Sequence, residues 1–441
     1  MTYSQKNFIT YIIIFGIILF LYHFIGYPLL LEYTSLSINV EQGLPYGAIP
    51  GDYQTYYLTA IKILNHPLDF YKTIIILGNS NYLAPFIFSL VLRATSSFES
   101  LIFYNLMVSL PLSAFIACQL HAVLHRFNID DAKCFLLNIV VVLSPFFFIT
   151  FTQISKDLFT HLFYAMSIRT LFLIRDKEFC YLSALSLVLC TLLLVFNRPF
   201  QLLISALVWV ILAFLFFIKD RKPKDMKGPL WIVLFLVATF LLHSQFVHQA
   251  GTGIEFLTDS VTQSIKPTKP TQTIQDESIE ETPAGINHGF MRGFFSALNS
   301  YRKYYIEANP DSAMVASPGL VFESPIDVII YLPKALSMVV WEPNPLRLLS
   351  SKSGYSHSLL KVLYIPWSFF VLLLSLWALF KITALFTFDN MLLVAYSFGS
   401  LLPYPFFIPN YGNIARYSSF LILFLLLVLI FSRLESKKYR P

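Results

Sequence analysis

The chain has 441 residues, of which 56% are hydrophobic and only 13% are charged, and its mean hydropathy is +0.65. In soluble domains about a quarter of all residues are charged. This composition therefore excludes an ordinary soluble domain and indicates an integral membrane protein. The formal net charge of +6 does not indicate nucleic-acid binding. The basic residues are spread along the chain or flank apolar runs, as membrane anchors do.

Apolar runs with almost no charge recur along the chain, each near the length of about 20 residues that crosses a hydrocarbon core of about 30 Å. The first is too long for a typical signal-peptide core, so we expect it to remain as a first span. We predict an all-α polytopic membrane protein with about ten transmembrane helices, forming one membrane domain over 1–441. The predicted spans are 8–31, 101–123, 134–155, 158–174, 179–197, 199–218, 229–249, 362–380, 391–409 and 417–432.

The basic residues predict the orientation of these spans. The densest cluster in a short loop lies between Lys219 and Lys227, and the C-terminal tail is also basic. The positive-inside rule then places both termini in the cytoplasm. Two large outer loops follow, 32–100 and 250–361, in which the short apolar stretches 82–92 and 326–341 are expected to be interfacial helices. The second loop has a polar, Pro- and Thr-rich centre, so we expect part of it to be mobile.

Several kinds of chemistry have no sequence support. The chain lacks the GxxxxGK[ST], GxGxxG, HExxH and CxxC motifs, which argues against nucleotide hydrolysis, dinucleotide binding and zinc proteolysis. The near absence of ionisable residues within the spans argues against an ion-coupled transporter. The cysteines lie in or beside apolar runs, so we expect buried small residues without a disulfide or a metal. They are Cys118, Cys134, Cys180 and Cys190.

The first outer loop contains a candidate catalytic acid. After Asp52, apolar and aromatic residues recur at helical spacing, so Asp52 is predicted to begin an amphipathic helix at the membrane surface. Its carboxylate fits two roles, a helix N-cap or a general base. The sequence alone leaves both open.

The loop after the first span contains Gly51-Asp52, followed by Tyr56-Tyr57-Leu58 and Ala60. This pattern resembles the corresponding loop of the membrane glycosyltransferases of the GT-C superfamily. This resemblance implies that Asp52 deprotonates an acceptor hydroxyl, which then attacks a sugar carried on a polyprenyl phosphate. Many members of the superfamily have two adjacent acids in this loop, whereas Tyr53 follows Asp52 here. We therefore predict no metal.

Three predicted outer hinges carry cations that could bind the donor phosphate. They are Lys156 beside Asp157, Arg198 before Pro199, and Arg416 beside Tyr417. An arginine fork suits phosphate oxygens, and similar residues in GT-C enzymes and O-antigen polymerase-like proteins imply the same role. We assign donor-phosphate binding to Lys156, Arg198 and Arg416, with Asp157, Tyr56 and Tyr417 in support. The alternative is that these groups only anchor helices in the headgroups.

The second outer loop supplies weaker candidates for binding an acceptor glycan, namely Arg292, Arg302 and Trp341. Aromatic faces stack on sugar rings, and arginines donate to their hydroxyls. Ordinary charges on a solvated helix would explain the same residues.

The residues and the resemblance together imply an enzyme, an inverting GT-C-type (hexosyltransferase-like) glycosyltransferase. It would move a sugar from a polyprenyl-phosphate donor to a lipid-linked or surface glycan, such as O-antigen or another envelope polysaccharide. We expect no cofactor, a multi-pass location in a bacterial inner (cytoplasmic) membrane, and a site facing the periplasm. Membrane lipid and other envelope-polysaccharide enzymes are the expected partners. A repeat-unit polymerase, a lipid-linked sugar flippase or transporter, and a structural subunit of an envelope complex remain as alternatives.

Overall fold

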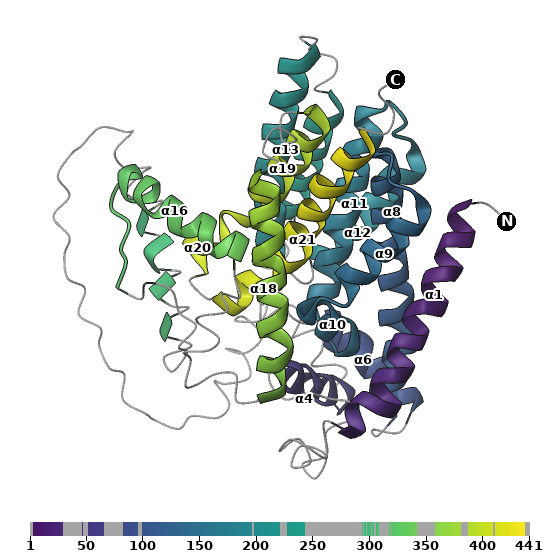
Figure 1. The fold of residues 1–441 in the computed structure, drawn as a ribbon. Helices are drawn as coiled ribbons and strands as arrows, with labels where there is room; N and C mark the ends of the chain where they lie inside the picture. Colours follow the sequence, from purple (N-terminus) through teal and green to yellow (C-terminus); the bar gives the residue numbers. More distant parts are fainter. Residues whose placement is uncertain are drawn as a thin grey trace, which may run out of the picture.

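The computed structural model of the protein describes most of the chain, and within the described residues it contains helices and no strand. The continuous described ranges are 3–29, 52–65, 83–95, 99–195, 198–220, 227–242, 319–341, 358–380, 387–408 and 411–436, together with 46, 293, 295–296, 298–300, 302–303, 306–307 and 317. The helices form a bundle with smaller helices at one end and along one side (Figure 1).

Among the described residues, five helical segments are long and apolar enough to cross a membrane, with mean hydropathies from 1.2 to 2.6. They are Ser4–Leu29, Ser100–Arg126, Asp157–Arg175, Gln201–Lys219 and Ile414–Ser432. These segments belong to α1 (Tyr3–Leu21) with the π-helix η1 (Tyr22–Gly26), to α7 (Ser100–Tyr104), η2 (Asn105–Ser109) and α8 (Leu110–Arg126), to α11 (Asp157–Arg175), to α13 (Pro199–Asp220) and to α21 (Tyr411–Ser436). An all-α, multi-pass membrane protein is therefore the class that the fold supports.

Shorter apolar helices occupy four further predicted segments, over Leu83–Ala94, Tyr181–Val195, Lys227–Leu242 and Tyr364–Phe380. The first two are α6 and α12, and the last lies within α18 (Ser358–Phe380). Each is shorter than the roughly 20 residues of a full span. The count of about ten spans therefore stays a prediction.

The predicted span 134–155 is not one straight helix. It is divided into α9 (Asp131–Val142) and α10 (Pro145–Thr152), which meet at a bend of 76°. Pro145 is the physical cause, because a residue before proline avoids the helical conformation and proline cannot donate to the preceding turn. Ser144 accordingly has an extended backbone, with φ −57° and ψ 132°.

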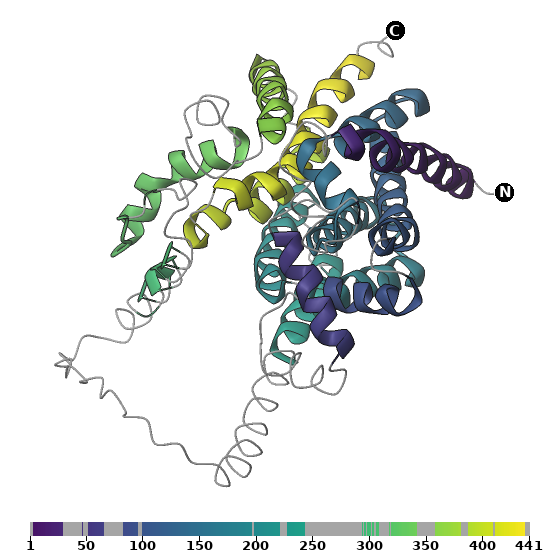
Figure 2. The same ribbon diagram turned by 90° about the horizontal axis from the view of Figure 1, so that it is seen from below.

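The centre of the bundle is formed by α11 and α21. In each of them 89% of the most apolar stretch is buried, against 28% in α1, which lies at the periphery. Side chains of α21 from Phe420 to Ile430 are almost completely enclosed by the neighbouring helices. Viewed along the bundle, α1 is at one edge and α21 passes through the middle (Figure 2). A polar group on α11 or α21 is therefore removed from both lipid and water.

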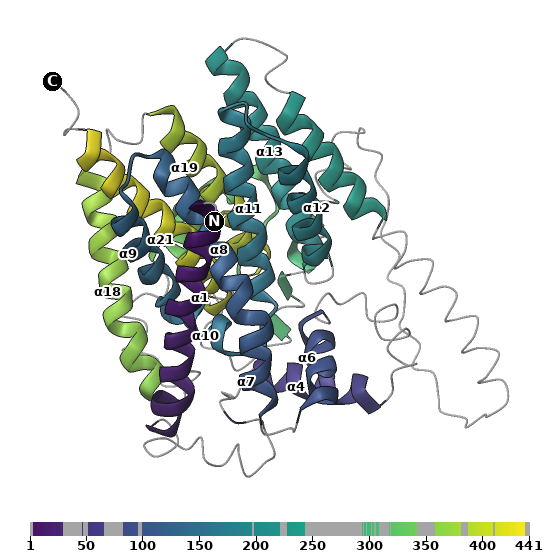
Figure 3. The ribbon, with the colours of Figure 1, turned by 90° about the vertical axis from the view of Figure 1, so that its right-hand side faces the viewer.

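At the end of the bundle where α11 begins, called the Asp157 end below, α4 (Asp52–Asn65) lies crosswise to the long helices (Figure 3). The helix begins at Asp52, as predicted. Tyr56, Tyr57 and Ala60 are buried against α6, whereas Leu58 is exposed, so the predicted amphipathic face is present. The side chain of Asp52 itself lies outside the described part of the structure.

On one side of the bundle lie α16 (Pro325–Trp341), α18 and the short helix α20 (Tyr404–Phe407), which follows α19 (Phe388–Leu401) (Figure 1). Leu402 and Pro403 separate α19 from α20. The predicted span 391–409 therefore appears as two helices and not as one.

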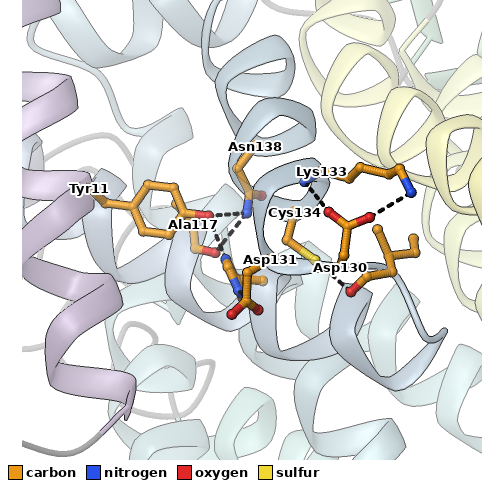
Figure 4. A network of polar contacts seen from close by, with 9 residues as sticks. Tyr11, Ala117, Asp130, Asp131, Lys133, Cys134 and Asn138 are labelled. Carbon is orange, nitrogen blue, oxygen red and sulfur yellow. Dashed lines mark hydrogen bonds and ion pairs between the residues drawn. The ribbon is translucent and has the colours of Figure 1, made fainter.

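A buried polar network joins α1, α8 and α9 far from the Asp157 end (Figure 4). The Asn138 amide donates to the Tyr11 hydroxyl at 2.6 Å, and that hydroxyl lies 2.9 Å from His121 Nδ1. His121 Nε2 in turn lies 3.3 Å from the Asp131 carboxylate. The Asn138 amide also bonds the Ala117 carbonyl, so the three helices are locked in register.

The cysteine prediction is correct for three of four residues. Cys118, Cys134 and Cys190 are buried, but Cys180 is exposed. Cys180 precedes the first residue of α12, Tyr181, which is 96% exposed, so the start of this apolar run is not covered by other helices. All four are free thiols.

Candidate functional site

The candidate site is built around Asp157, the first residue of α11. Its backbone N–H donates to the Ser155 hydroxyl at 3.1 Å, which fixes the turn entering the helix. The residue is only 2% exposed. A carboxylate buried this deeply in a membrane bundle is costly unless charged or hydrogen-bonding groups compensate it.

Arg198 is the main partner of this carboxylate. Its Nη2 donates to Asp157 Oδ1 at 2.7 Å, and its guanidinium lies 4.5 Å from the centre of the Tyr417 ring. Pro199 begins α13 directly after it, which is the position where proline is best tolerated in a helix. Tyr417 also donates its hydroxyl to Asp157 Oδ1, at 3.2 Å. The site thus joins the beginnings of α11, α13 and α21.

The guanidinium of Arg198 stays charged in this environment. Burial alone would lower its pKa, but the Asp157 carboxylate raises it, and the resulting pKa lies above the ordinary value of an arginine. Arg198 Nε is buried and has no acceptor among the described residues. A buried N–H without an acceptor is unfavourable, so the hydrogen-bonding capacity of Arg198 is not fully used within the described residues.

Two further cations act on the same carboxylate. Both Lys156 and Arg416 interact electrostatically with Asp157, and both are half-buried. Three cations therefore surround a single carboxylate, and the positive end of α11 adds to them. Such a group of cations is suited to an anion with several oxygens, such as a phosphate.

Two tyrosine rings and an amide side chain lie beside these charged residues. The rings of Tyr404 and Tyr417 lie 4.9 Å apart, and the Tyr404 hydroxyl donates to Gln201 Oε1. Gln201 follows Arg198 by three residues, so both side chains lie on the same face of the chain as α13 begins. Tyr56 of α4 lies close enough to Arg198 to interact with it electrostatically. Asp52 precedes Tyr56 by one helical turn, so the beginning of α4 lies near this site.

Three of these residues are absent from the sequence-based set, Gln201, Tyr404 and Tyr164. The one available signal was Gln201, a lone amide within an apolar run and at helical spacing from Arg198. Tyr164, two turns after Asp157 on α11, is fully buried and interacts electrostatically with Tyr404. Nothing in the sequence distinguishes these tyrosines from the many at the membrane interface.

The three residues predicted to bind the acceptor differ in their position and exposure. Arg292 lies outside the described residues, and Trp341 is the last residue of α16, where it is 38% exposed. Arg302 is only 1% exposed, and its guanidinium bonds three backbone carbonyls. This burial leaves Arg302 little surface for a glycan, and its role as an acceptor ligand stays a prediction.

Within the described residues no group of three or more His, Cys, Asp and Glu side chains is placed to hold a metal ion. The arrangement instead combines fixed cations, a neutralising carboxylate and aromatic rings. Such a site can bind an anion and stabilise negative charge that develops on it.

The comparisons with known proteins add no further assignment. No protein-family model matches the chain, and no curated protein and no solved structure is detectably similar to it.

Proposed function

We propose that the protein is an inverting membrane glycosyltransferase, which takes a sugar from a polyprenyl-phosphate donor and passes it to a lipid-linked or surface glycan. The proposed phosphate site consists of Lys156, Arg198 and Arg416, arranged around Asp157. In this proposal the Asp157 end of the bundle faces the outside of the cytoplasmic membrane.

The observation that carries the proposal is the group of cations that acts on one buried carboxylate. Among the described residues, Arg198, Arg416 and Lys156 all act electrostatically on Asp157. Arg198 Nε is also buried without an acceptor among the described residues. A phosphate would accept hydrogen bonds from cations of this kind. It would also become more negative as the glycosyl bond breaks, so preorganised cations would stabilise the transition state more than the ground state.

The carboxylates take different roles in this scheme. Asp157 is occupied by Arg198 and Tyr417, which makes its oxygen a poor proton acceptor and suits it to orienting the guanidinium. Asp52 begins α4, whose next turn carries Tyr56 beside Arg198. We therefore assign the general base to Asp52, which would take the proton of the acceptor hydroxyl as that oxygen attacks the sugar carbon. One carboxylate base is sufficient for an inverting displacement.

The test is the surface-glycan profile of cells that carry variants at matched membrane levels. Asp52→Asn removes the proposed base, Arg198→Lys keeps the charge but removes the fork, and Lys303→Met is the control on an exposed residue. Loss of one sugar at otherwise normal chain length in both site variants supports the transferase. Collapse to single repeat units identifies a polymerase instead, and an unchanged profile in both variants refutes the proposal.

A further inference from the structure

The Arg302 side chain connects two separate parts of the chain through hydrogen bonds. Its Nη1 donates to the carbonyls of Pro405 and Phe406, both at 3.0 Å, and its Nη2 donates to the Ser317 carbonyl at 3.3 Å. The first two carbonyls belong to α20, more than 100 residues further along the chain. Arg302 thus joins its own segment to Ser317, 15 residues further on, and to α20, more than 100 residues further on.

Aromatic rings enclose this guanidinium. It lies 5.2 Å from the centre of the Phe322 ring and 5.8 Å from that of Tyr331 on α16. Both rings also contact Phe406 of α20, at centroid distances of 5.8 Å and 5.4 Å. Cation–π contacts of this kind are strongest where water is excluded, and Arg302 is nearly inaccessible.

The segment that Arg302 holds is itself constrained. Ser317 has φ 49°, in the left-handed region that residues other than glycine rarely adopt. Its hydroxyl accepts a hydrogen bond from Lys334 of α16, while its carbonyl accepts from Arg302. Nearby, the Asn299 side chain exchanges two hydrogen bonds with the backbone of Phe322, at 2.8 and 2.9 Å. A strained residue held from both sides indicates that the local geometry is imposed by its surroundings.

The helix that Arg302 contacts, α20, contributes directly to the candidate site. α20 is only four residues long and begins with Tyr404, whose hydroxyl bonds Gln201 and whose ring lies 4.9 Å from the ring of Tyr417. A helix of one turn has almost no stability of its own. Its position must therefore come from contacts such as those of Arg302.

We propose that Arg302 is a positioning residue, which fixes α20 against Ser317 and α16 and so holds Tyr404 beside Gln201 and Tyr417. Its predicted role in acceptor binding is then replaced by an indirect one. The effect on α20 follows from the geometry alone, whereas the expected effect on glycosyl transfer rests on the proposed function.

The first readout is amide hydrogen exchange of the purified full-length protein, in wild type, Arg302→Met, Arg302→Lys and the adjacent exposed control Lys303→Met. Amides of α20 and of Ile408 bond to the carbonyls of Pro403 and Tyr404. Losing the clamp should speed their exchange by about tenfold or more, because three buried hydrogen bonds to a charged group are lost. Exchange in α11 and α21 should stay unchanged, which separates a local release from general unfolding. Arg302→Lys keeps the charge and most of the volume but removes the forked guanidinium. Its exchange rates therefore show the effect of the lost guanidinium hydrogen bonds even if Arg302→Met does not fold.

The second readout is the rate of sugar transfer in Arg302→Met, Tyr404→Phe and the double variant. If Arg302 acts through Tyr404, the double variant is no slower than the slower single variant, whereas additive losses overturn the proposal. Unchanged exchange of α20 in both Arg302 variants also overturns it. If wild type transfers no sugar at all, the proposed function fails, while the exchange experiment still decides whether Arg302 clamps α20.

Discussion

The pair of Asp157 and Arg198 should be energetically coupled, and this coupling can be measured. Arg198→Met removes the guanidinium that bonds the buried Asp157 carboxylate at 2.7 Å. The Tyr417 hydroxyl still donates to this carboxylate, and Lys156 and Arg416 still act on it electrostatically. Removing one partner of a buried ion pair costs about 3–5 kcal/mol, because the other charge remains buried and unpaired. Asp157→Asn leaves the guanidinium in the same position and should have a cost in the same range.

The double variant removes both charges, so the penalty for an unpaired charge disappears. We expect its free energy of unfolding to exceed the additive expectation by about 2 kcal/mol, as for other residues in direct contact. The assay is equilibrium unfolding in mixed micelles, with a common detergent composition for all four proteins. As a control, Lys303→Met breaks a pair with Glu307 that is exposed on both sides, and it should change stability by less than about 0.5 kcal/mol. Additive effects of the two site variants, within about 0.5 kcal/mol, would refute the reasoning.

Three further predictions concern other contacts. Tyr417→Phe keeps the ring under Arg198 but removes the hydroxyl that donates to Asp157, and thermal unfolding should show a loss of about 1.5–3 kcal/mol, whereas no loss would contradict that hydrogen bond. Gly399→Ala would place a Cβ 2.9 Å from Val208 Cγ2, so it should destabilise the contact of α13 with α19 by about 1–3 kcal/mol, and Val208→Ala in the same chain should recover part of the loss. The pKa of Asp327 is lowered by the backbone N–H groups of Glu323 and Ser324 and by the Ser324 hydroxyl. This depressed pKa stabilises the start of α16 above the ordinary value of 3.8 and ceases to do so as the pH falls through the lower folded value. Amide exchange at the start of α16 should therefore quicken relative to Asp327→Asn as the solution is acidified, and parallel pH profiles would contradict this.

Much of the architecture follows from simple patterns in the sequence. Long uncharged runs predict helices because the backbone in lipid must satisfy its own hydrogen bonds. The hinges carrying Lys156, Arg198 and Arg416 were predicted to lie at one end because each connects spans at the same side. The structure brings these three hinges together around Asp157.

The pairing of individual side chains could not be predicted in the same way. The bond between Arg198 and Asp157 spans 41 residues, and that between Tyr404 and Gln201 spans 203. Both depend on how far each helix is rotated about its own axis, which packing decides and the position of an apolar run does not. Arg302 shows the same limit, because an arginine in a polar loop sequence gives no sign that it will be buried against α20.

Local chain breaks were missed for a different reason. Hydropathy treats 134–155 as one run, although Pro145 interrupts it and bends the chain by 76°. The proline was visible, but many membrane helices continue through a proline when neighbours satisfy the freed carbonyls. Cys180 was misplaced because the flank of an apolar run was assumed to be covered.

Binding of a short-chain polyprenyl phosphate to the purified protein tests the central claim most directly. We would measure its affinity for wild type, Lys156→Met, Arg416→Met and the control Lys303→Met by calorimetry at fixed ionic strength. The charge arrangement predicts saturable binding to wild type and the control, and an affinity about tenfold lower in each site variant, since a charge-assisted hydrogen bond contributes about 1.5–3 kcal/mol. Equal affinities in all four proteins, or no saturable binding to wild type, would contradict the assignment of a phosphate site to the Asp157 end of the bundle.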